Sequence, residues 1–547
     1  MKPYRLSLAL AAAISSAMPV SAHAAHAPVV KAPAGAVRGR TEGRLHVFKG
    51  IPYALPPVGP LRWRAPRPMP RWAGIRLAEK FGPACFQPQS KVVSVYTEKP
   101  MPMSEDCLTL NVWAPADARN APVLVWIYGG ALWAGASREP LYDGTRLAER
   151  GLVVVTINYR LGVLGWLAHP GLSAESPLKI SGNYGLLDQI AALRWVKRNI
   201  AAFGGNPANV TIAGESAGGL SVMYLMASPE ARGLFARVIA QSAYMISTPE
   251  LRARQFGEMP AEEAGLRLAG ELHAPTIAAL RAMDPKTLTD EAAADRFPAF
   301  GTVNGHTLPG QLVDIFGQGK QAPVPVLAGF NAGEIRSLLV LAPPTPASLV
   351  AYTRVIRPRY GDLANAFLRL YPAADMRESI LAASRDALYG WTAERLVRKQ
   401  AAIGVPSFLY FFDHGYPAED AAGLHAFHGS ELPYLFGTMA RTPAHWPKIP
   451  DTPAERRLSN AMIEYWASFA ATGRPMAPGE PDWLPFGETG NYMDFTTAPH
   501  LSRHLLPGMY QLNEAVVCRR RTAGNVPWNW NVGLASPPLP PATAQCR

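Results

Sequence analysis

The most informative part of this chain is the stretch Asn209-Val-Thr-Ile-Ala-Gly-Glu-Ser-Ala-Gly-Gly219. Within it, a β-branched run at 210–213 leads into Gly-Glu-Ser-Ala-Gly at 214–218, and an apolar helical pattern follows at 220–227. Strand, tight turn and helix are the setting in which Gly-x-Ser-x-Gly forms a sharp bend with its serine at the top. Side chains in place of the flanking glycines would clash across such a bend. We therefore expect Ser216 between the carboxyl end of a strand and the amino end of a helix.

Other apolar runs of strand length lie before and after this stretch, at 123–128, 152–158, 237–243, 324–329 and 407–412. Runs that are apolar on both faces are typical of central parallel strands covered on both sides. The segments 185–203 and 454–472 have apolar residues at helical spacing, and the second is expected to be the last long helix. The alternation predicts an α/β fold with a mostly parallel sheet, helices on both faces, and helical decorations from the Ala- and Glu-rich segment 249–309.

The run at 123–128 is followed by Gly129, Gly130 and Ala131. The backbone N–H groups of such a turn are unshielded, and an oxyanion hole consists of two or three fixed donors of this kind. Because the carboxyl ends of parallel strands share one crevice, we expect these donors to lie near Ser216.

Candidates for an acid and a base follow the last two apolar runs. Glu334 comes after one of them, and a loop with His414, His425 and His428 comes after the other. A serine hydroxyl needs a base to become a nucleophile, and a carboxylate holds the histidine in the correct tautomer. The order serine, acid, histidine is that of the α/β-hydrolase fold. Spacing alone does not choose among the three histidines and leaves Asp413 open as the acid.

The first 25 residues have the features of an export signal. Lys2 and Arg5 precede an apolar run at 6–20, and Ala22-His23-Ala24 resembles a cleavage site, so we expect cleavage near Ala24 and Ala25. The remainder, 26–547, is expected to form a single domain with a Pro-rich tail, secreted or periplasmic. No later segment approaches about 18 uninterrupted apolar residues, which predicts no membrane anchor after cleavage.

Charge and cysteine content narrow the classes of function. The formal net charge is +12, but no basic stripe is interleaved with aromatic residues, which argues against nucleic-acid binding. An even set of four cysteines is typical of disulfides in an exported protein. Cys85 with Cys107 and Cys518 with Cys546 are the pairs closest in sequence, although three pairings are possible. None has metal-ligand spacing, and we expect neither a metal nor a cofactor.

As a whole, the chain resembles the type-B carboxylesterases, which include para-nitrobenzyl esterases, animal carboxylesterases and cholinesterases. The resemblance runs from about residue 35 to the final helix. The matching segments, in chain order, are Phe48-Lys-Gly-Ile-Pro-Tyr53, Pro56-Pro-Val-Gly59, Ser104-Glu-Asp-Cys-Leu108, Tyr128-Gly-Gly130, Asn158-Tyr-Arg160, Gly182-Asn-Tyr-Gly-Leu-Leu-Asp188, Phe203-Gly-Gly-Asn-Pro207, Gly214 to Gly218, Gln241-Ser242, Glu334 and His428-Gly-Ser-Glu-Leu-Pro-Tyr434.

The resemblance implies an α/β-hydrolase that hydrolyses small-molecule carboxylic esters, with roles for particular residues. Ser216 would be the nucleophile, Glu334 the acid and His428 the base. The backbone N–H groups of Gly130, Ala131 and Ala217 would bind the oxyanion.

Supporting structure is implied as well. Ser242 stands where the family has a serine behind the acid. Cys85 and Cys107 match the first disulfide of the family, and Arg62 with Glu105 match its structural ion pair.

The chain departs from the family pattern at several positions. Ala131 stands where many relatives have a third glycine, Ala243 follows Gln241-Ser242 where glycine is common, and Ile335 replaces the usual glycine after Glu334. The loop between the first two cysteines contains no tryptophan, which argues against a cholinesterase-like cation site.

Alternative functions are an amidase, thioesterase or lipase that uses the same residues, or a binding protein of the kind found among relatives that have lost them. Retention of the serine, acid and histidine favours an enzyme. Tyr128, Leu132 and Trp133, beside the turn at 129–131, indicate an apolar, partly aromatic cleft that suits uncharged esters of modest size, with the core as the alternative for Tyr128 and Trp133.

Overall fold

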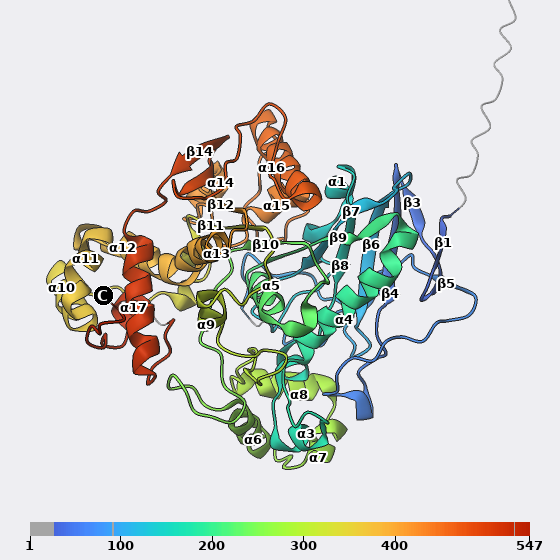
Figure 1. Cartoon of the computed structure of the whole chain (residues 1–547), viewed down its shortest axis with the longest axis horizontal. Coiled ribbons are helices and arrows are strands. Elements are labelled where there is room, and N and C mark those ends of the chain that lie inside the picture. Colours follow the sequence, from blue (N-terminus) through green and yellow to red (C-terminus); the bar gives the residue numbers. More distant parts are fainter. Residues whose placement is uncertain (1–26, 90–91, 530, 547) are drawn as a thin grey trace, which may run out of the picture.

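The computed structural model describes residues 27–89, 92–529 and 531–546 (Figure 1). A sheet of eleven strands runs through the centre of the molecule. Its strands, from one edge to the other, are β14 (Pro499–Arg503), β13 (Asn491–Phe495), β12 (Ser407–Phe412), β11 (Val326–Asn331), β10 (Arg237–Gln241), β9 (Gly205–Glu215), β7 (Ala121–Ile127), β8 (Val153–Ile157), β6 (Thr109–Pro115), β4 (Leu45–Pro52) and β3 (Arg40–Glu42). The predicted export signal at 1–25 lies outside the described residues.

The middle of this sheet, from β13 to β8, is parallel, and both edges are antiparallel. β7, β8, β10, β11 and β12 lie where the apolar runs predict strands, with bounds that differ by at most two residues. Their residues are almost all buried. The mostly parallel sheet is thus confirmed.

Helices pack on both faces of the sheet. In Figure 1, α16 (Pro453–Thr472) lies above the central strands, and α4 (Tyr184–Asn199) and α5 (Ala217–Ala227) lie below them. α16 begins where the Thr452 side chain accepts a hydrogen bond from the Glu455 N–H, and it ends at Gly473, whose φ is 84°. All three helices contact β9, the strand that leads into Ser216.

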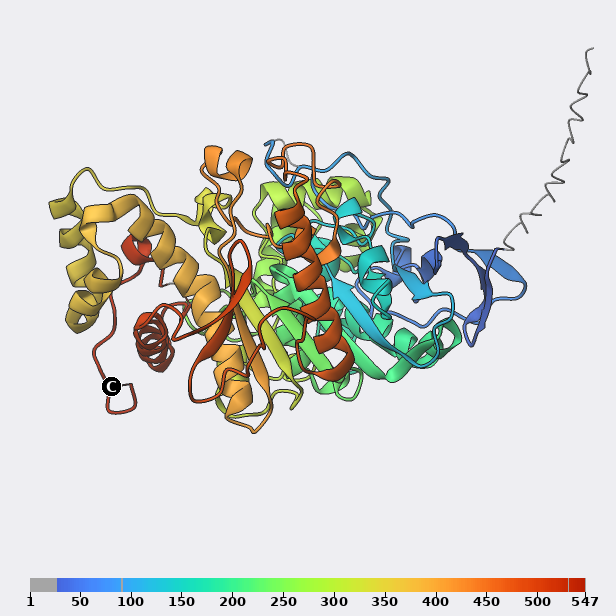
Figure 2. The same cartoon turned by 90° about the horizontal axis from the view of Figure 1, so that it is seen from above.

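Among the remaining helices, α13 (Trp391–Ala401) packs against β11 and β12. The others are α1 (Thr145–Ala148), α2 (Gly162–Trp166), α3 (Pro170–Glu175), α6 (Ala261–Glu271), α7 (Ile277–Ala282), α8 (Pro285–Ala294), α9 (Leu312–Gly317), α10 (Leu349–Tyr360), α11 (Ala364–Leu370), α12 (Met376–Arg385), α14 (Pro417–Ala421), α15 (Leu432–Phe436) and α17 (Met509–Ala523). α6, α7 and α8 confirm the helical character of 249–309. A small sheet of β1 (Val29–Ala32), β2 (Gly35–Arg38) and β5 (Ile75–Leu77) lies at the far right of Figure 2.

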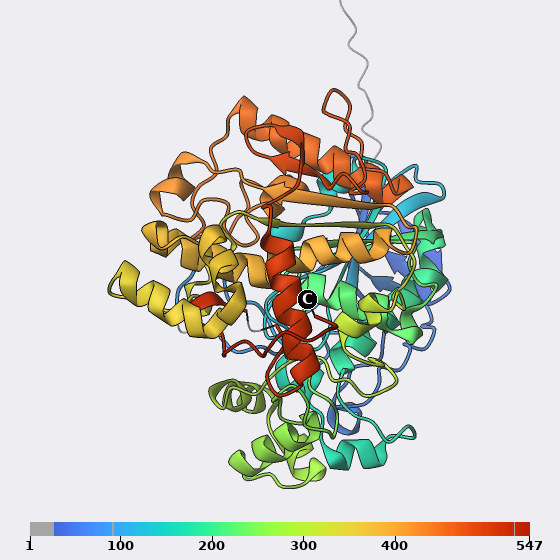
Figure 3. The same cartoon turned by 60° about the vertical axis from the view of Figure 1, so that its left-hand side comes forward.

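The prediction that 454–472 is the last long helix is wrong, because α17 follows it (red in Figure 3). α17 lies between Gly508 and Gly524, both with left-handed φ. It contributes Leu512 and Val516 to a second apolar cluster that it forms with α10, α11 and α12. Near its basic end, the Arg519 side chain is buried and forms an ion pair with Asp362, with N···O distances of 2.6 and 2.7 Å.

Disulfides and an ion pair hold the loops at both ends of the chain. Cys85 is bonded to Cys107, as the resemblance implies, and Cys518 is bonded to Cys546, a pairing that the sequence left open. The second bond ties the Pro-rich tail to α17. Arg62 and Glu105 form a bidentate pair, with both N···O distances at 2.7 Å, as the resemblance implies. Within the described part of the chain, no helix is long and apolar enough to span a membrane.

Candidate active site

Ser216 occupies a strained bend between β9 and α5. Its φ is 57°, in the left-handed region that a residue with a Cβ rarely adopts. The bend has no room for side chains at its glycines. A Cβ on Gly218 would lie 2.0 Å from the Ile127 carbonyl oxygen, and one on Gly214 would lie 2.5 Å from the carbonyl carbon of Gly218. The predicted need for glycines at both positions is therefore explained by these close approaches.

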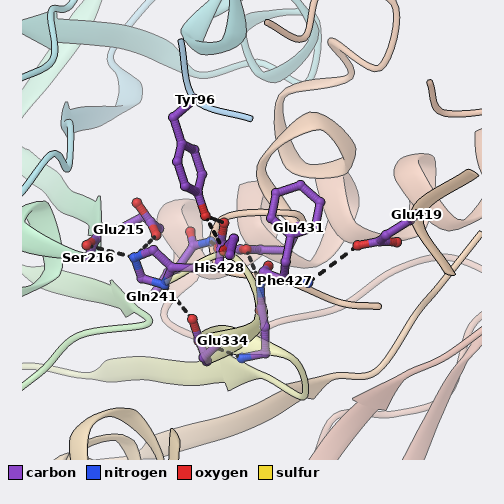
Figure 4. A network of polar contacts seen from close by, with 11 residues as sticks. Tyr96, Glu215, Ser216, Gln241, Glu334, Glu419, Phe427, His428 and Glu431 are labelled. Atoms are coloured by element: carbon purple, nitrogen blue, oxygen red, sulfur yellow. Dashed lines mark hydrogen bonds and ion pairs between the residues drawn. The ribbon is translucent and has the colours of Figure 1, made fainter. Parts of the chain in front are cut away.

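His428 lies within hydrogen-bonding distance of Ser216 (Figure 4). Its Nε2 is 2.8 Å from the Ser216 Oγ, and its Nδ1 makes a short hydrogen bond with the Glu334 carboxylate. Glu334 opens a short turn just after β11, and the loop that carries His428 follows β12. The two loops are joined where the Gly333 N–H donates to the Ala426 carbonyl at 2.9 Å.

The other candidates from the sequence lie elsewhere. His414 is hydrogen-bonded through Nε2 to Glu455 at 2.8 Å. His425 lies between Asp413 and Asp420, with N···O distances of 3.0 and 2.7 Å. Of the three candidate histidines, only His428 contacts the serine, and Asp413 is paired with a different histidine.

The turn after β7 presents its N–H groups beside Ser216. Gly130 has a φ of 98°, and a Cβ there would lie 2.2 Å from the Ala134 carbonyl oxygen, so only glycine fits. Ala131 has a φ of 56°, unusual for a residue with a Cβ. In the described structure, no group accepts a hydrogen bond from the N–H of Gly130, Ala131 or Ala217. Gly130 and Ala131 line the same cavity as Ser216.

That cavity has a volume of about 970 Å³, and His428 also lines it. Most of its wall is apolar or aromatic, including Tyr142, Tyr389 and Trp446. Tyr128, Leu132 and Trp133 are not part of the wall. The first two are fully buried, and the Tyr128 ring stacks on Tyr159 with centroids 4.6 Å apart. Tyr128 and Leu132 therefore belong to the core, Trp133 is half-buried and packs against it, and other side chains form the cleft.

Comparison with known proteins agrees with this geometry. A family model described as "Carboxylesterase family" matches residues 26–512. The chain belongs to the carboxylesterase family.

The chain is also similar to proteins and solved structures that are named as esterases. It is 37% identical to a fumonisin B1 esterase of Sphingopyxis macrogoltabida, over 88% of this chain and 89% of the relative. It is 36% identical to the para-nitrobenzyl esterase of Bacillus subtilis, over 81% and 89%. A solved PNB esterase structure superposes with a TM-score of 0.76 at 33% identity, covering 88% of this chain and 99% of its own. The family and the α/β-hydrolase fold expected from the sequence are thereby confirmed, and the chain is a carboxylic-ester hydrolase.

Two further carboxyl groups, those of Glu215 and Glu431, lie near His428. Neither of them was given a role from the sequence. The Glu215 Oε1 is 3.1 Å from the His428 Nε2, and Glu215 lines the cavity. Glu431 accepts hydrogen bonds from the side chains of Gln241 at 2.9 Å and Asn331 at 2.7 Å. Their places in the sequence could have indicated them, because Glu215 immediately precedes the serine and Glu431 follows His428 by three residues.

The pKa values of these buried carboxyl groups and of the histidine depend on one another, because their charges interact at short distance. Burial raises the pKa of Glu215 to about 8 and that of Glu431 to about 7. Burial acts to lower the pKa of His428, but the charges of Glu215 and Glu334 outweigh it and raise that pKa to about 9. The surroundings of His428 therefore favour its protonated form, the state that a base reaches after it takes a proton.

Ser242 lies at the end of β10 with a φ of 43°, and its N–H donates to the Gly329 carbonyl at 2.8 Å. Its hydroxyl is buried and has no hydrogen-bond partner among the residues that the structure describes. No hydrogen bond joins it to Glu334, so its role behind the acid stays a prediction.

Proposed function

We propose that this carboxylesterase cleaves esters through an acyl-enzyme on Ser216, with His428 as the base and Glu334 as the acid. The observation that supports this most directly is the chain of hydrogen bonds from the Ser216 Oγ through both ring nitrogens of His428 to Glu334. The three side chains follow three different strands, β9, β11 and β12, in the parallel part of the sheet. Such a convergence is what nucleophilic catalysis by serine requires.

In the first half of the reaction, the Ser216 oxygen attacks the ester carbonyl carbon while its proton passes to the His428 Nε2. The carbonyl oxygen becomes negative, and the free N–H groups of Gly130, Ala131 and Ala217 are placed to donate to it. Collapse of this intermediate breaks the bond to the alcohol, which leaves with the proton from His428. In the second half, water attacks the acyl-enzyme and gives a proton to His428; the bond to the Ser216 oxygen then breaks, His428 returns the proton to that oxygen, and the acid leaves.

Glu334 supports the histidine in both halves. Its carboxylate accepts a hydrogen bond from the His428 Nδ1–H, so that in the neutral ring the proton is on Nδ1 and the bare Nε2 faces the serine. The other carboxylate oxygen accepts from the Asn331 backbone N–H at 2.8 Å, which fixes the orientation of the acid. A negative charge held in this way stabilises the imidazolium that forms in each transfer.

The substrates we propose are uncharged esters of modest size. The cavity of about 970 Å³ has mostly apolar and aromatic walls, which favour an apolar acyl or alcohol group.

The decisive experiment is the turnover of a chromogenic short-chain ester by Ser216→Ala. Triad members act as a unit, so we expect turnover to fall by several orders of magnitude with the fold intact. Ser228→Ala is a matched control, because Ser228 is a buried serine at the other end of α5. Equal turnover by Ser216→Ala and the wild type would overturn the proposal.

We also propose that residues 1–25 are an export signal and that the rest is a single catalytic domain, secreted or periplasmic. The two disulfides support an oxidising compartment. Amino-terminal sequencing of the mature protein should begin near residue 25, whereas a mature protein that retains Met1 would contradict export.

A further inference from the structure

Tyr96 reaches the active site from the loop that the Cys85–Cys107 disulfide closes (Figure 4). Its hydroxyl donates a hydrogen bond to the backbone carbonyl of His428 at 2.7 Å. The same oxygen is 2.6 Å from the Ser337 Oγ. A phenol has one proton and a carbonyl can only accept, so the Ser337 hydroxyl is the donor to Tyr96.

The two partners of this phenol belong to the two segments that hold the acid and the base. Ser337 ends the short turn that begins with Glu334. His428 is bonded through its own backbone, so the contact leaves its ring free for Ser216 and Glu334. One hydroxyl group therefore connects the segment of the acid to the segment of the base.

The position of Tyr96 is itself restrained on several sides. Its ring centroid is 6.2 Å from that of Phe427, the neighbour of His428, and 6.2 Å from that of Trp446. At the start of the same loop, the Gln87 side chain and the Gly135 backbone exchange hydrogen bonds of 3.0 and 2.9 Å. The loop is thus attached to the turn that holds the free N–H groups as well as to the acid and the base.

We propose that Tyr96 is a positioning residue for ester hydrolysis: its hydroxyl fixes the backbone of His428 against the turn of Glu334, at the separation where the imidazole reaches Ser216. This inference rests on the proposed roles of Ser216, Glu334 and His428. Tyr96 acts through His428 and not on the reacting atoms. Since a misplacement of about 1 Å can cost about a hundredfold in rate, a bond that sets this separation affects the chemical step.

The Tyr96 hydroxyl keeps its proton, and can therefore donate to the His428 carbonyl, over the working pH range of the enzyme. Burial raises the pKa of Tyr96 well above its ordinary value, although the bond from Ser337 acts in the opposite direction. Its proton is therefore present over the whole pH range in which a histidine base works.

Tyr96→Phe tests the proposal because it removes only the hydroxyl and keeps the ring between Phe427 and Trp446. We expect kcat to fall about tenfold, equivalent to about 1.4 kcal/mol of barrier, with KM changed less than about twofold. The factor should be the same across a panel of esters that differ in acyl length and alcohol size. A residue that served only as a wall of the cavity would instead change KM, and by amounts that depend on the ester.

A matched control is Tyr352→Phe. Tyr352 is a buried tyrosine of α10 whose hydroxyl also donates to a backbone carbonyl, that of Tyr371 at 3.1 Å. The two variants should lose similar amounts of thermal stability, but only Tyr96→Phe should lose kcat.

Ser337→Ala provides a second, independent test, because it removes one partner of the phenol and leaves Tyr96 in place. We expect a smaller fall in kcat, and the double variant with Tyr96→Phe should be no slower than Tyr96→Phe alone. Wild-type kcat in folded Tyr96→Phe, a change in KM only, or additive losses in the double variant would each overturn the positioning role. None of these results would affect the assignment of Ser216, which its own variant tests.

Discussion

Replacement of Ala131 by glycine separates the two contributions of this residue to the site, its N–H group and its methyl group. Because its φ is 56°, the backbone conformation costs alanine about 1 kcal/mol relative to glycine. The greater freedom of glycine in the unfolded chain costs about 0.4 to 1 kcal/mol in the opposite sense. The two nearly cancel, so Ala131→Gly should change the melting temperature by less than about 3 °C.

The same variant should distinguish small from bulky esters. The N–H donor is kept, so turnover of a primary-alcohol ester such as n-butyl acetate should change less than about tenfold. Ala131 lines the cavity, and loss of its methyl group opens space beside the ester carbon. We expect kcat/KM for tert-butyl acetate relative to n-butyl acetate to rise at least about fivefold, the rate equivalent of about 1 kcal/mol of relieved overlap. An unchanged ratio would refute the placement of this methyl group.

Ala131→Pro tests the donor itself. Proline has no N–H and fixes φ near −65°, about 120° from the value of 56° found here. Turnover should fall by about a hundredfold or more, since one oxyanion donor contributes about 2.7 to 4 kcal/mol. A cooperative thermal transition must first show that the variant is folded. Near-normal turnover by folded Ala131→Pro would mean that other groups bind the oxyanion.

Two further predictions concern the histidine and its surroundings. His428→Ala should be as damaging to ester turnover as loss of the serine, whereas His425→Ala should keep most activity, and the reverse result would contradict the choice of base. Activity should rise with pH as His428 loses its proton, in the range between the ordinary imidazole pKa and about 9. The Glu215 carboxyl group lies 3.1 Å from the His428 Nε2 and becomes charged only near its raised pKa of about 8; Glu215→Gln removes that charge, so the pKa of His428 should fall. The rise in kcat/KM, measured from about pH 5 to pH 9, should then move to lower pH by roughly one unit, and a move to higher pH would show that Glu215 does not act through its charge.

The sheet could be predicted from the sequence because each central strand is a run of apolar side chains buried on both faces. The run at 407–412 became β12 with the same bounds. The edge hairpin β13–β14 and helix α17 gave no such signal. α17 packs basic as well as apolar residues, and Arg519 is buried only because Asp362, far away in the sequence, compensates its charge.

The site could be predicted only in part, because some of its residues are positioned by contacts between segments that are distant in the sequence. The bend at Ser216 is local, and its glycines mark it in the sequence. The choice among the histidines came from the family resemblance, because it depends on how the loop after β12 folds. That loop is held by the contact of Gly333 with Ala426 and by the phenol of Tyr96, which are contacts between distant segments. Such contacts cannot be predicted from the spacing of residues along the chain.

The most direct test of the central claim is covalent labelling of the enzyme by an organophosphate, followed by peptide mass spectrometry. An activated serine displaces the leaving group and keeps the phosphoryl group on its oxygen. We predict one adduct per chain, on Ser216, formed in step with the loss of ester turnover and absent from Ser216→Ala. Inactivation accompanied by an adduct on another residue, with Ser216 unmodified, would contradict the account.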